Sequence, residues 1–459
     1  MTISTVILSG GTATNDLVPL FSRSDFKVSY VLPILDTGGS SSEIIRVIGG
    51  PAIGDIRSRL IQLIPHHQRR LRDVLSLRLN ANASVAKAQW EQIVDGSHEL
   101  WHGIPNSTKE IVRSFLLHIH VELLKRSRIY AGSSPGKQFK FEFANIGNLL
   151  LTAIRLFTGS LDSAIELFMK ITDIDSSSEV LPCVNTNFSY HISAFLSDGS
   201  TITGQSQISH PSMKSIYSNS KSSIESSSEP DTFGPDQQID GLDEFHDFDD
   251  ANIPSDEEIG NTPLYTHPDL KKSQLHFRKT SEIEPLLSPI KRIFYVSPYG
   301  EEICPTAQSR VLSKLLHAEI IVYSIGSLMT SITPIVILKG VGRAIAENPT
   351  KFKKRILLLN GNEDRETAGL GALDYIRVIV ELAQYLIKKS GHGQVLDWTL
   401  FVTHLFYMEN SKIPVDIEAL ENIGITCVAI KQATDGIDKY DLEDLSLNFL
   451  KLSGTGAPS

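Results

Sequence analysis

The sequence contains few cysteines, and they lie far apart. Its 459 residues include three, Cys183, Cys304 and Cys427, with no CxxC motif and no Cys/His spacing typical of a zinc site. The sequence therefore supports neither a disulfide framework nor a structural zinc site. This sparse use of cysteine favours a reducing compartment.

Long apolar runs are also missing. No segment approaches the ~18 consecutive apolar residues that a membrane-spanning helix requires. The opening residues, MTISTVILSGG, lack the basic start and the long apolar core of a secretory signal. We therefore expect a cytoplasmic protein without a membrane partner. Its 41% hydrophobic residues are enough for a sizeable core.

Basic residues are absent from one long stretch. Between Ser222 and Gly260 there are thirteen acidic residues and no Lys or Arg, so the rest of the chain carries a formal charge of about +3 instead of −10. The wider segment 211–285 is rich in Ser and Asp and too weakly apolar to fold. We predict a disordered insertion there, which is either a solvated linker or a docking segment for a protein partner. We expect no nucleic-acid partner.

Outside that segment, short apolar strands alternate with helical patterns. Residues 4–9 and 28–35 are β-branched runs that end at glycine-containing loops, and each loop is followed by a helical pattern. This order predicts an α/β fold with a Rossmann-like, mostly parallel sheet and helices on both faces. We place a mostly helical insertion at 66–135 within a single domain, 1–459. Sheets of this type often dimerise through surface helices, so a homodimer is one alternative. The sequence does not indicate which helix would form the contact.

The later part of the chain continues the pattern. Residues 180–208 alternate apolar and polar side chains around Asp198-Gly199, which predicts a hairpin. The runs IKRIFYVSP, AEIIVYS and RILLLN are further strands, and 372–390 is a strongly amphipathic helix that ends at Gly391. We therefore expect 286–459 to belong to the same α/β domain.

Five polar loops are the candidates for chemistry. At least four follow a predicted strand, and in open α/β sheets ligands bind at the carboxyl ends of the strands. Glycines let a phosphate approach backbone N–H groups, and Ser and Thr hydroxyls add donors. None matches GxGxxG or GxxxxGK[ST], so a tight turn is the alternative for each. The loops are GGTATN (10–15), DTGGSSS (36–42), GGPAIGDIR (49–57), SIGSLMTS (324–331) and NGNEDRE (360–366).

Charged and amide side chains in and near these loops have two interpretations each. Asp36 and Asp55 either hold Mg²⁺, which favours one or two carboxylates plus substrate phosphates, or cap helices. Arg57 is suited to neutralise a phosphate. Asn145 and Asn148 either cap a helix or read a base edge or a sugar.

Several segments resemble the phospholactate transferase-like (CofD-like) superfamily. They are VILSGGTATNDLVPLF, DTGGSSSEIIRVIGGPAIGDIRSRLIQL, NIGNLLLTAIRLFTGSLDSAIELF, AEIIVYSIGSLMTSITPIVILKGVGRAI and LLLNGNEDRETAGL. The sequence looks closest to the branch of bacterial gluconeogenesis factors (YvcK-like), and the two insertions suggest a eukaryotic-type member. The match covers roughly 1–65, 140–210 and 290–370. It departs from the branch at Thr37, which replaces the second acid of a DDGG loop.

The resemblance implies a Rossmann-like domain that binds a nucleotide or nucleotide-sugar of the GDP or UDP type. Transferase members of the superfamily move a phospholactyl-type group from a guanosine diphosphate carrier and use a divalent metal. Regulatory members resemble UDP-sugar-binding proteins without an established reaction. This chain is thus either a transferase acting with Mg²⁺ or a non-catalytic nucleotide-sugar-binding regulator of carbon or cell-wall metabolism.

The loops and the resemblance together give a set of candidate site residues. Asp36, Asp55 and Arg57 are the catalytic candidates, with Asp36 and Asp55 as the Mg²⁺ ligands. The nucleotide- or phosphate-binding candidates are Gly10, Gly11, Thr12, Asn15, Gly38, Gly39, Ser40, Ser41, Asn145, Asn148, Gly326, Ser327, Thr330 and Asn360.

Overall fold

A computed structural model describes most of the chain. The described residues are 2–35, 38–129, 138–209, 285–350, 353–389, 396–434 and 439–452. Two predictions lie outside them: the disordered insertion, which falls almost wholly on 210–284, and the roles of Asp36 and Thr37.

The main sheet has seven parallel strands in the order β11-β10-β9-β8-β1-β2-β3. From β1 the chain adds strands on one side, crosses to the other side of β1 at β8, and then adds strands outward. The strand order therefore reverses between β1 and β8, as in doubly wound folds. The strands are β1 (Ile3–Leu8), β2 (Phe26–Leu32), β3 (Ser178–Pro182), β8 (Ile320–Tyr323), β9 (Lys354–Leu358), β10 (His404–Met408) and β11 (Thr426–Ile430).

Helices cover both faces of this sheet, which confirms the predicted fold class. Successive residues of β1 explain why: Ile3 and Ile7 belong to one hydrophobic core, while Val6 and Leu8 belong to the other. The first core receives η1 (Ala13–Leu17), α1 (Val18–Phe21) and α16 (Leu442–Leu452). The second receives α3 (Gly54–Leu63), α11 (Ser309–His317), α12 (Thr333–Val336), α13 (Val341–Ala346) and α14 (Ala372–Lys389).

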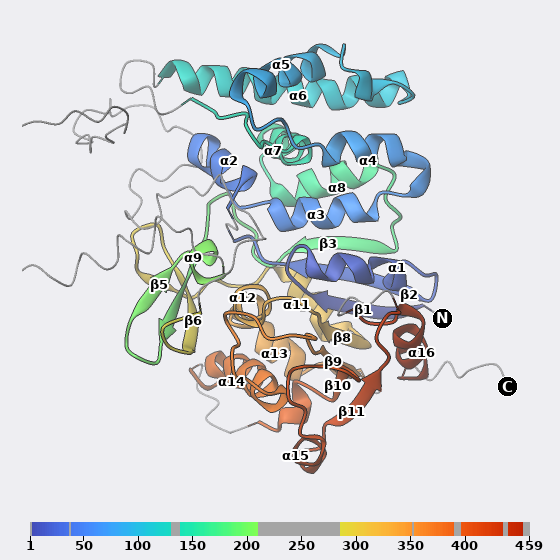
Figure 1. Ribbon diagram of the computed structural model, residues 1–459, viewed down its shortest axis with the longest axis vertical. Coiled ribbons are helices and arrows are strands. Elements are labelled where there is room, and N and C mark those ends of the chain that lie inside the picture. The colour runs from blue at the N-terminus through green and yellow to red at the C-terminus, as the bar shows by residue number, and fades with distance from the viewer. Residues whose placement is uncertain are drawn as a thin grey trace, which may run out of the picture.

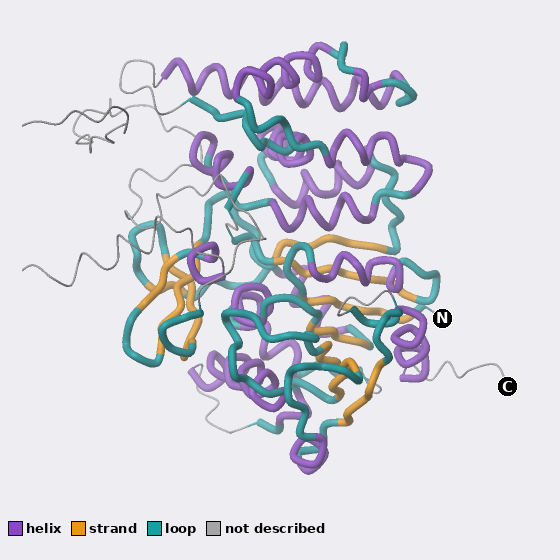
Figure 2. The backbone as a smooth tube through the Cα atoms, viewed as in Figure 1, coloured by secondary structure: helices purple, strands orange, loops and turns teal. Residues whose placement is uncertain are grey.

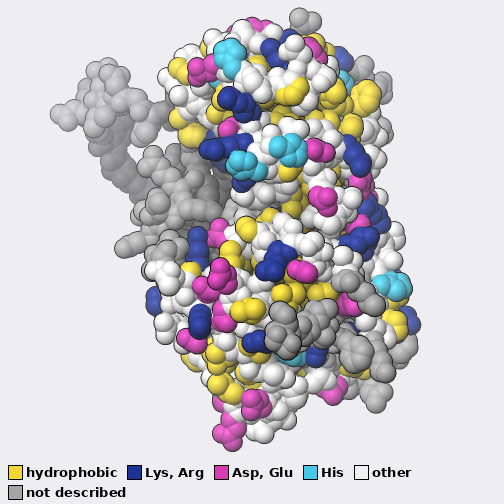
Figure 3. All heavy atoms as spheres, turned by 90° about the vertical axis from the view of Figure 1, so that its right-hand side faces the viewer, with side chains coloured by type: hydrophobic (Ala, Val, Ile, Leu, Met, Phe, Trp, Pro, Cys, Tyr) yellow, Lys and Arg dark blue, Asp and Glu magenta, His cyan; other side chains and the backbone are white. Residues whose placement is uncertain are grey.

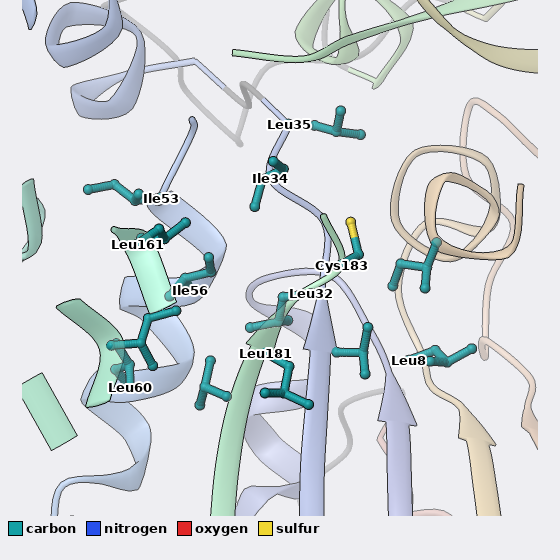
Figure 4. Close-up of a cluster of buried hydrophobic side chains, with 14 of the residues drawn as sticks. Leu8, Leu32, Ile34, Leu35, Ile53, Ile56, Leu60, Leu161, Leu181 and Cys183 are labelled. Atoms are coloured by element: carbon teal, nitrogen blue, oxygen red, sulfur yellow. The ribbon is translucent and has the colours of Figure 1, made fainter. Parts of the chain in front are cut away.

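The second core joins the strands to α3. Figure 4 shows Leu32 and Leu181 of neighbouring strands, with Ile56 and Leu60 of α3 beside them. All four side chains are fully buried. This packing fixes the first turn of α3 close to the ends of β1 and β2.

Further helices are stacked beyond α3. In Figure 1, α5 and α6 form the outermost layer, and α4, α7 and α8 lie between that layer and the sheet. Trp90 of α5 is fully buried; its indole N–H donates to Nδ1 of His120 (2.9 Å), and its ring stacks on Phe141. These helices are η2 (His66–Gln68), α4 (Arg69–Ser76), α5 (Ala83–Asp95), η3 (Glu99–Trp101), α6 (Asn106–Ile129), α7 (Ile146–Thr158) and α8 (Leu161–Ile171).

A second, antiparallel sheet stands beside the main one (Figure 2). Its order is β5-β4-β6-β7, built from β4 (His191–Leu196), β5 (Thr201–Thr203), β6 (Ile290–Val296) and β7 (Glu302–Ile303). The predicted hairpin around Asp198-Gly199 is confirmed as β4 and β5. The IKRIFYV run is a strand as predicted, but it pairs with β4 here and not with the parallel sheet.

The remaining short helices connect these parts. They are α2 (Ser40–Ile48), α9 (Gln205–Ser209), η6 (Leu328–Ile332), η7 (Trp398–Leu400) and α15 (Ile417–Asn422). Acidic, basic and hydrophobic side chains are interspersed on the face shown in Figure 3. Within the described ranges, every helix is too short or too polar to cross a membrane.

Candidate functional site

A cavity of about 1110 Å³ lies where the carboxyl ends of the central strands meet. Its wall comes from the loops that follow β1, β2, β8 and β9, from the first turn of α3, and from α9. It therefore spans the point where the strand order reverses, which is the usual ligand site of doubly wound folds. Its volume slightly exceeds the ~300–1,000 Å³ typical of ligand pockets, so it has room for a nucleotide.

Most of the predicted site residues line this one cavity. Asn15 and Asn145 do not line it, and Asp36 lies outside the described residues. Those that line it are Gly10, Gly11, Thr12, Gly38, Gly39, Ser40, Ser41, Asp55, Arg57, Asn148, Gly326, Ser327, Thr330 and Asn360.

Close contacts and backbone angles explain why glycine occupies these positions in the first two loops. A Cβ on Gly11 would lie 2.0 Å from Oδ1 of Asp55, and a Cβ on Gly10 would lie 2.2 Å from Oγ of Ser331. Gly38 and Gly39 have φ values of 89° and 68°, a region that glycine adopts readily. The loop after β1 thus packs closely against the side chains of Asp55 and Ser331, and the loop after β2 has a backbone conformation that suits glycine.

Asp55 lies in the first turn of α3, close to the β1 loop. The N-cap of α3 is Ile53, so Asp55 is the second residue of the helix and not its N-cap residue. The carboxylate instead lines the cavity beside Gly11, at the helix end where the backbone dipole favours negative charge.

Arg57 follows Asp55 by two residues in α3, and its side chain is held by a contact with α7. Its Nε donates to Oδ1 of Asn148 over 3.2 Å. Burial, and next the charge of Arg78, lower the pKa of Arg57 to about 10, while Asp55 opposes the shift. Because that pKa stays well above 7, the guanidinium is charged at neutral pH.

Arg78 was missed by the sequence analysis. It follows α4 and lines the cavity, where its positive charge acts on Arg57. The segment is placed by backbone pairing: Arg78 bridges antiparallel to Asn145, and the Leu79 N–H donates to the Ala144 carbonyl (2.8 Å). No glycine or loop signature marks this position, so only the tertiary pairing reveals it. The cavity lining also contains Arg365 and Lys439 and four acidic residues, Asp16, Asp55, Asp364 and Glu366. Arg57 and Arg78 therefore concentrate positive charge at one part of the wall, where an anion would be attracted.

The two asparagines at the start of α7 have different roles. Asn145 is the N-cap: its Oδ1 accepts the Asn148 N–H (3.2 Å), and its amide donates to the Ser76 carbonyl (3.1 Å). Asn148 lines the cavity and orients Arg57. Asn15 likewise supports the site without lining the cavity, because its amide donates to Oγ of Ser58 over 2.9 Å.

A buried carboxylate that the sequence analysis did not select organises the late loops. Glu366 is 5% exposed and accepts from Thr330 Oγ1 (2.8 Å), Thr330 N–H (3.1 Å), Ser209 Oγ (2.5 Å) and Ser327 Oγ. Burial, and next the charge of Asp364, raise the pKa of Glu366 despite these donors. The predicted phosphate ligands Ser327 and Thr330 thus reach the cavity wall with their donors directed at Glu366.

Asn360 also braces the same loop. Its Nδ2 donates to the Gly326 carbonyl over 2.7 Å, and its Oδ1 accepts the Gly326 N–H over 2.9 Å. These two hydrogen bonds connect the segment after β9 to the loop after β8, and one of them takes up the Gly326 N–H. The Gly326 N–H is therefore already used within the protein.

The predicted Mg²⁺ site can be compared with the donors present. Within the described part of the chain there is no group of three or more His, Cys, Asp or Glu side chains suited to a metal ion. Mg²⁺ usually takes one or two protein carboxylates and completes its octahedron with water and phosphate oxygens. Asp55 on the cavity wall fits one such carboxylate.

The parallel sheet and the cavity at its reversal point define a doubly wound α/β protein whose cavity is lined by glycine-rich loops. The family model described as "2-phospho-L-lactate transferase CofD" matches residues 5–432. The chain therefore belongs to the CofD family.

Three comparisons extend this result. Over 96% of its length the chain is 42% identical to "Uncharacterized protein YNL011C" of Saccharomyces cerevisiae, of which it covers 98%. It is 33% identical over 109 residues, 24% of this chain, to the "Putative gluconeogenesis factor" of Deinococcus radiodurans, of which it covers 20%. The crystal structure of protein BH3568 from Bacillus halodurans, a member of the UPF0052 family, aligns with 98% of this chain and 100% of its own at a TM-score of 0.58 and 15% identity, which shows a shared fold.

Proposed function

We propose that the protein binds the diphosphate of a nucleotide or nucleotide-sugar and transfers a phosphoryl-linked group from it. The observation that carries this proposal is the pair of arginines, Arg57 and Arg78, in one cavity with two glycine-rich loops. Their mutual repulsion is tolerated in the folded protein, and a diphosphate would relieve it. The CofD family name supports group transfer as the reaction class.

In this proposal the chain acts by positioning and by charge neutralisation. Asn148 holds Arg57 so that its remaining guanidinium N–H groups can bind phosphate oxygens. Backbone N–H groups at the glycines of the first two loops would receive further oxygens. Asp55, with Asp36, would hold Mg²⁺, which when bound neutralises charge that develops on the phosphate. Such positioning needs no protein nucleophile.

The alternative is a regulator that binds a nucleotide-sugar without turning it over. One observation favours it: Thr37 stands where the similar bacterial loop carries a second acid, so this chain has one carboxylate fewer for a metal. Binding would then be retained while transfer is lost.

Calorimetric titration of the full chain tests the proposal. We expect GDP, UDP or their sugar conjugates to bind more tightly with Mg²⁺ than without, and Asp55→Ala to remove that difference. Arg57→Ala should weaken binding at least tenfold, whereas Arg310→Ala, in an exposed ion pair with Glu166, should not. If none of these compounds binds the wild-type chain, the proposal is wrong. Release of nucleotide from a bound donor supports transfer, and stable binding across donors supports the regulator.

A further inference from the structure

Phe143 has a backbone conformation that a bulky aromatic residue rarely adopts. Its φ is 65°, and the described residues contain one other non-glycine residue with positive φ, Asp173. It lies in a tight turn in which the Ala144 N–H donates to the Phe141 carbonyl over 2.9 Å. Positions with positive φ in such turns favour glycine or asparagine. Phenylalanine there costs folding free energy.

Hydrogen bonds on the residues that follow hold this turn in place. The Ala144 carbonyl accepts the Leu79 N–H (2.8 Å), and the Asn145 N–H donates to Oγ of Ser40 (3.0 Å). The Ile146 N–H donates to the Leu77 carbonyl (3.0 Å). The segment that carries Arg78 and the start of α2 therefore fix where the Phe143 ring can lie.

Phe143 is placed differently from the aromatic residues that precede it. The preceding aromatics, Phe139 and Phe141, pack on each other with ring centroids 5.0 Å apart, and Phe141 stacks on Trp90. Phe143 belongs to neither hydrophobic core; it is half-buried and lines the cavity that also contains Arg78. A strained residue whose ring borders a ligand site indicates a role in binding.

We propose that Phe143 is the stacking surface for the nucleobase of the ligand whose phosphates Arg57 and Arg78 bind. This inference rests on the proposed function and adds where the base lies. Stacking on an aromatic ring tolerates any base, since each base has a π face. The ring therefore selects compounds that carry a base over those that carry phosphates alone, and leaves the choice between guanine and uracil to other contacts.

Titrations with GDP, UDP and inorganic pyrophosphate test this inference on the full chain. Phe143→Asn removes the ring and is compatible with the left-handed backbone, so folding should be preserved or improved. We expect its affinity for GDP and UDP to fall about tenfold or more while its affinity for pyrophosphate stays unchanged. Phe143→Tyr should keep wild-type affinity for all three. Phe157→Asn, at an aromatic that is 68% exposed and outside the cavity, is the matched control.

The outcomes separate this inference from the function on which it rests. If Phe143→Asn binds GDP and UDP like the wild type, or loses pyrophosphate to the same degree, the stacking role is wrong while diphosphate binding stands. If the wild-type chain binds neither the nucleotides nor pyrophosphate, both are wrong. A melting temperature of Phe143→Asn at or above the wild-type value shows that any loss of affinity is not a loss of fold.

Discussion

Gly11 and Asp55 touch so closely that a single added carbon atom would separate them. A Cβ on Gly11 would lie 2.0 Å from Asp55 Oδ1 and 2.7 Å from its Cγ. The contact joins the loop after β1 to the first turn of α3, and both line the cavity. The position of the Asp55 carboxylate therefore depends on the absence of a side chain at residue 11.

Gly11→Ala should disable the site while the protein still folds. The methyl group would push Asp55 away, so we expect the Mg²⁺-dependent part of nucleotide binding to be lost in calorimetry. Gly371→Ala is the control, because a Cβ there would meet its nearest neighbour, the Pro414 carbonyl, at an ordinary 3.4 Å. Unchanged binding by Gly11→Ala would show that Asp55 has no part in the site.

Arg78→Ala should separate binding from stability. Removing this charge relieves the repulsion on Arg57, so the melting temperature of the ligand-free protein should stay the same or rise. Nucleotide affinity should fall at least tenfold, because a charge-assisted contact to a phosphate is lost. Arg343→Ala, in an exposed pair with Glu347, should change neither quantity appreciably. A large drop in melting temperature would instead assign Arg78 to the scaffold.

Glu366→Ala should destabilise the protein. It would leave the donors of Ser209, Ser327 and Thr330 buried without their acceptor, at a cost of about 1–3 kcal/mol for each donor that water cannot reach. We expect a clear fall in the urea midpoint of unfolding. Glu381→Gln on the exposed side of α14 should leave the midpoint unchanged. An unaltered midpoint for Glu366→Ala would show that the hydroxyls find other partners.

His404 should make stability fall in mild acid. Burial, and next the charge of Lys354, lower its pKa in the folded protein from 6.5 to about 4. Between these two values the unfolded chain binds a proton that the folded chain does not, so the free energy of unfolding decreases as pH falls from 6.5 towards 4. His404→Asn should reduce that decrease by about 1 kcal/mol per pH unit. Urea titrations at several pH values measure it, with exposed His66→Asn as the control that should keep the wild-type slope.

The sequence predicted those parts of the site that rest on local pattern. Gly10 to Thr12 and Gly38 to Ser41 follow buried strands, and a strand followed by glycines and hydroxyls predicts a loop at the sheet's edge wherever the strand lies. The alternation of short apolar strands with helical patterns predicted the parallel sheet, and the structure shows β1 and β2 contributing to a core on each face.

Contacts between distant segments account for what could not be predicted. Arg78 reaches the cavity because it pairs with Asn145, and nothing near residue 78 indicates that pairing. Asn360 was selected from its loop and Glu366 was not, since only the folded chain shows which polar side chain is buried. The sequence also did not determine which sheet contains β6. The alternating apolar and polar side chains of β6 are compatible with any strand that has one covered face.

The wall of the cavity begins at Gly10 and ends at Leu442, and this has a consequence during synthesis. A chain emerging from the ribosome can assemble the β1 and β2 loops early, but the strands on the other side of β1 and the residues from Lys439 to Leu442 are made later. The cavity wall is therefore completed only after the residues up to Leu442 have been synthesised. Any compound that needs the complete wall distinguishes a chain that extends past Leu442 from one that stops before it.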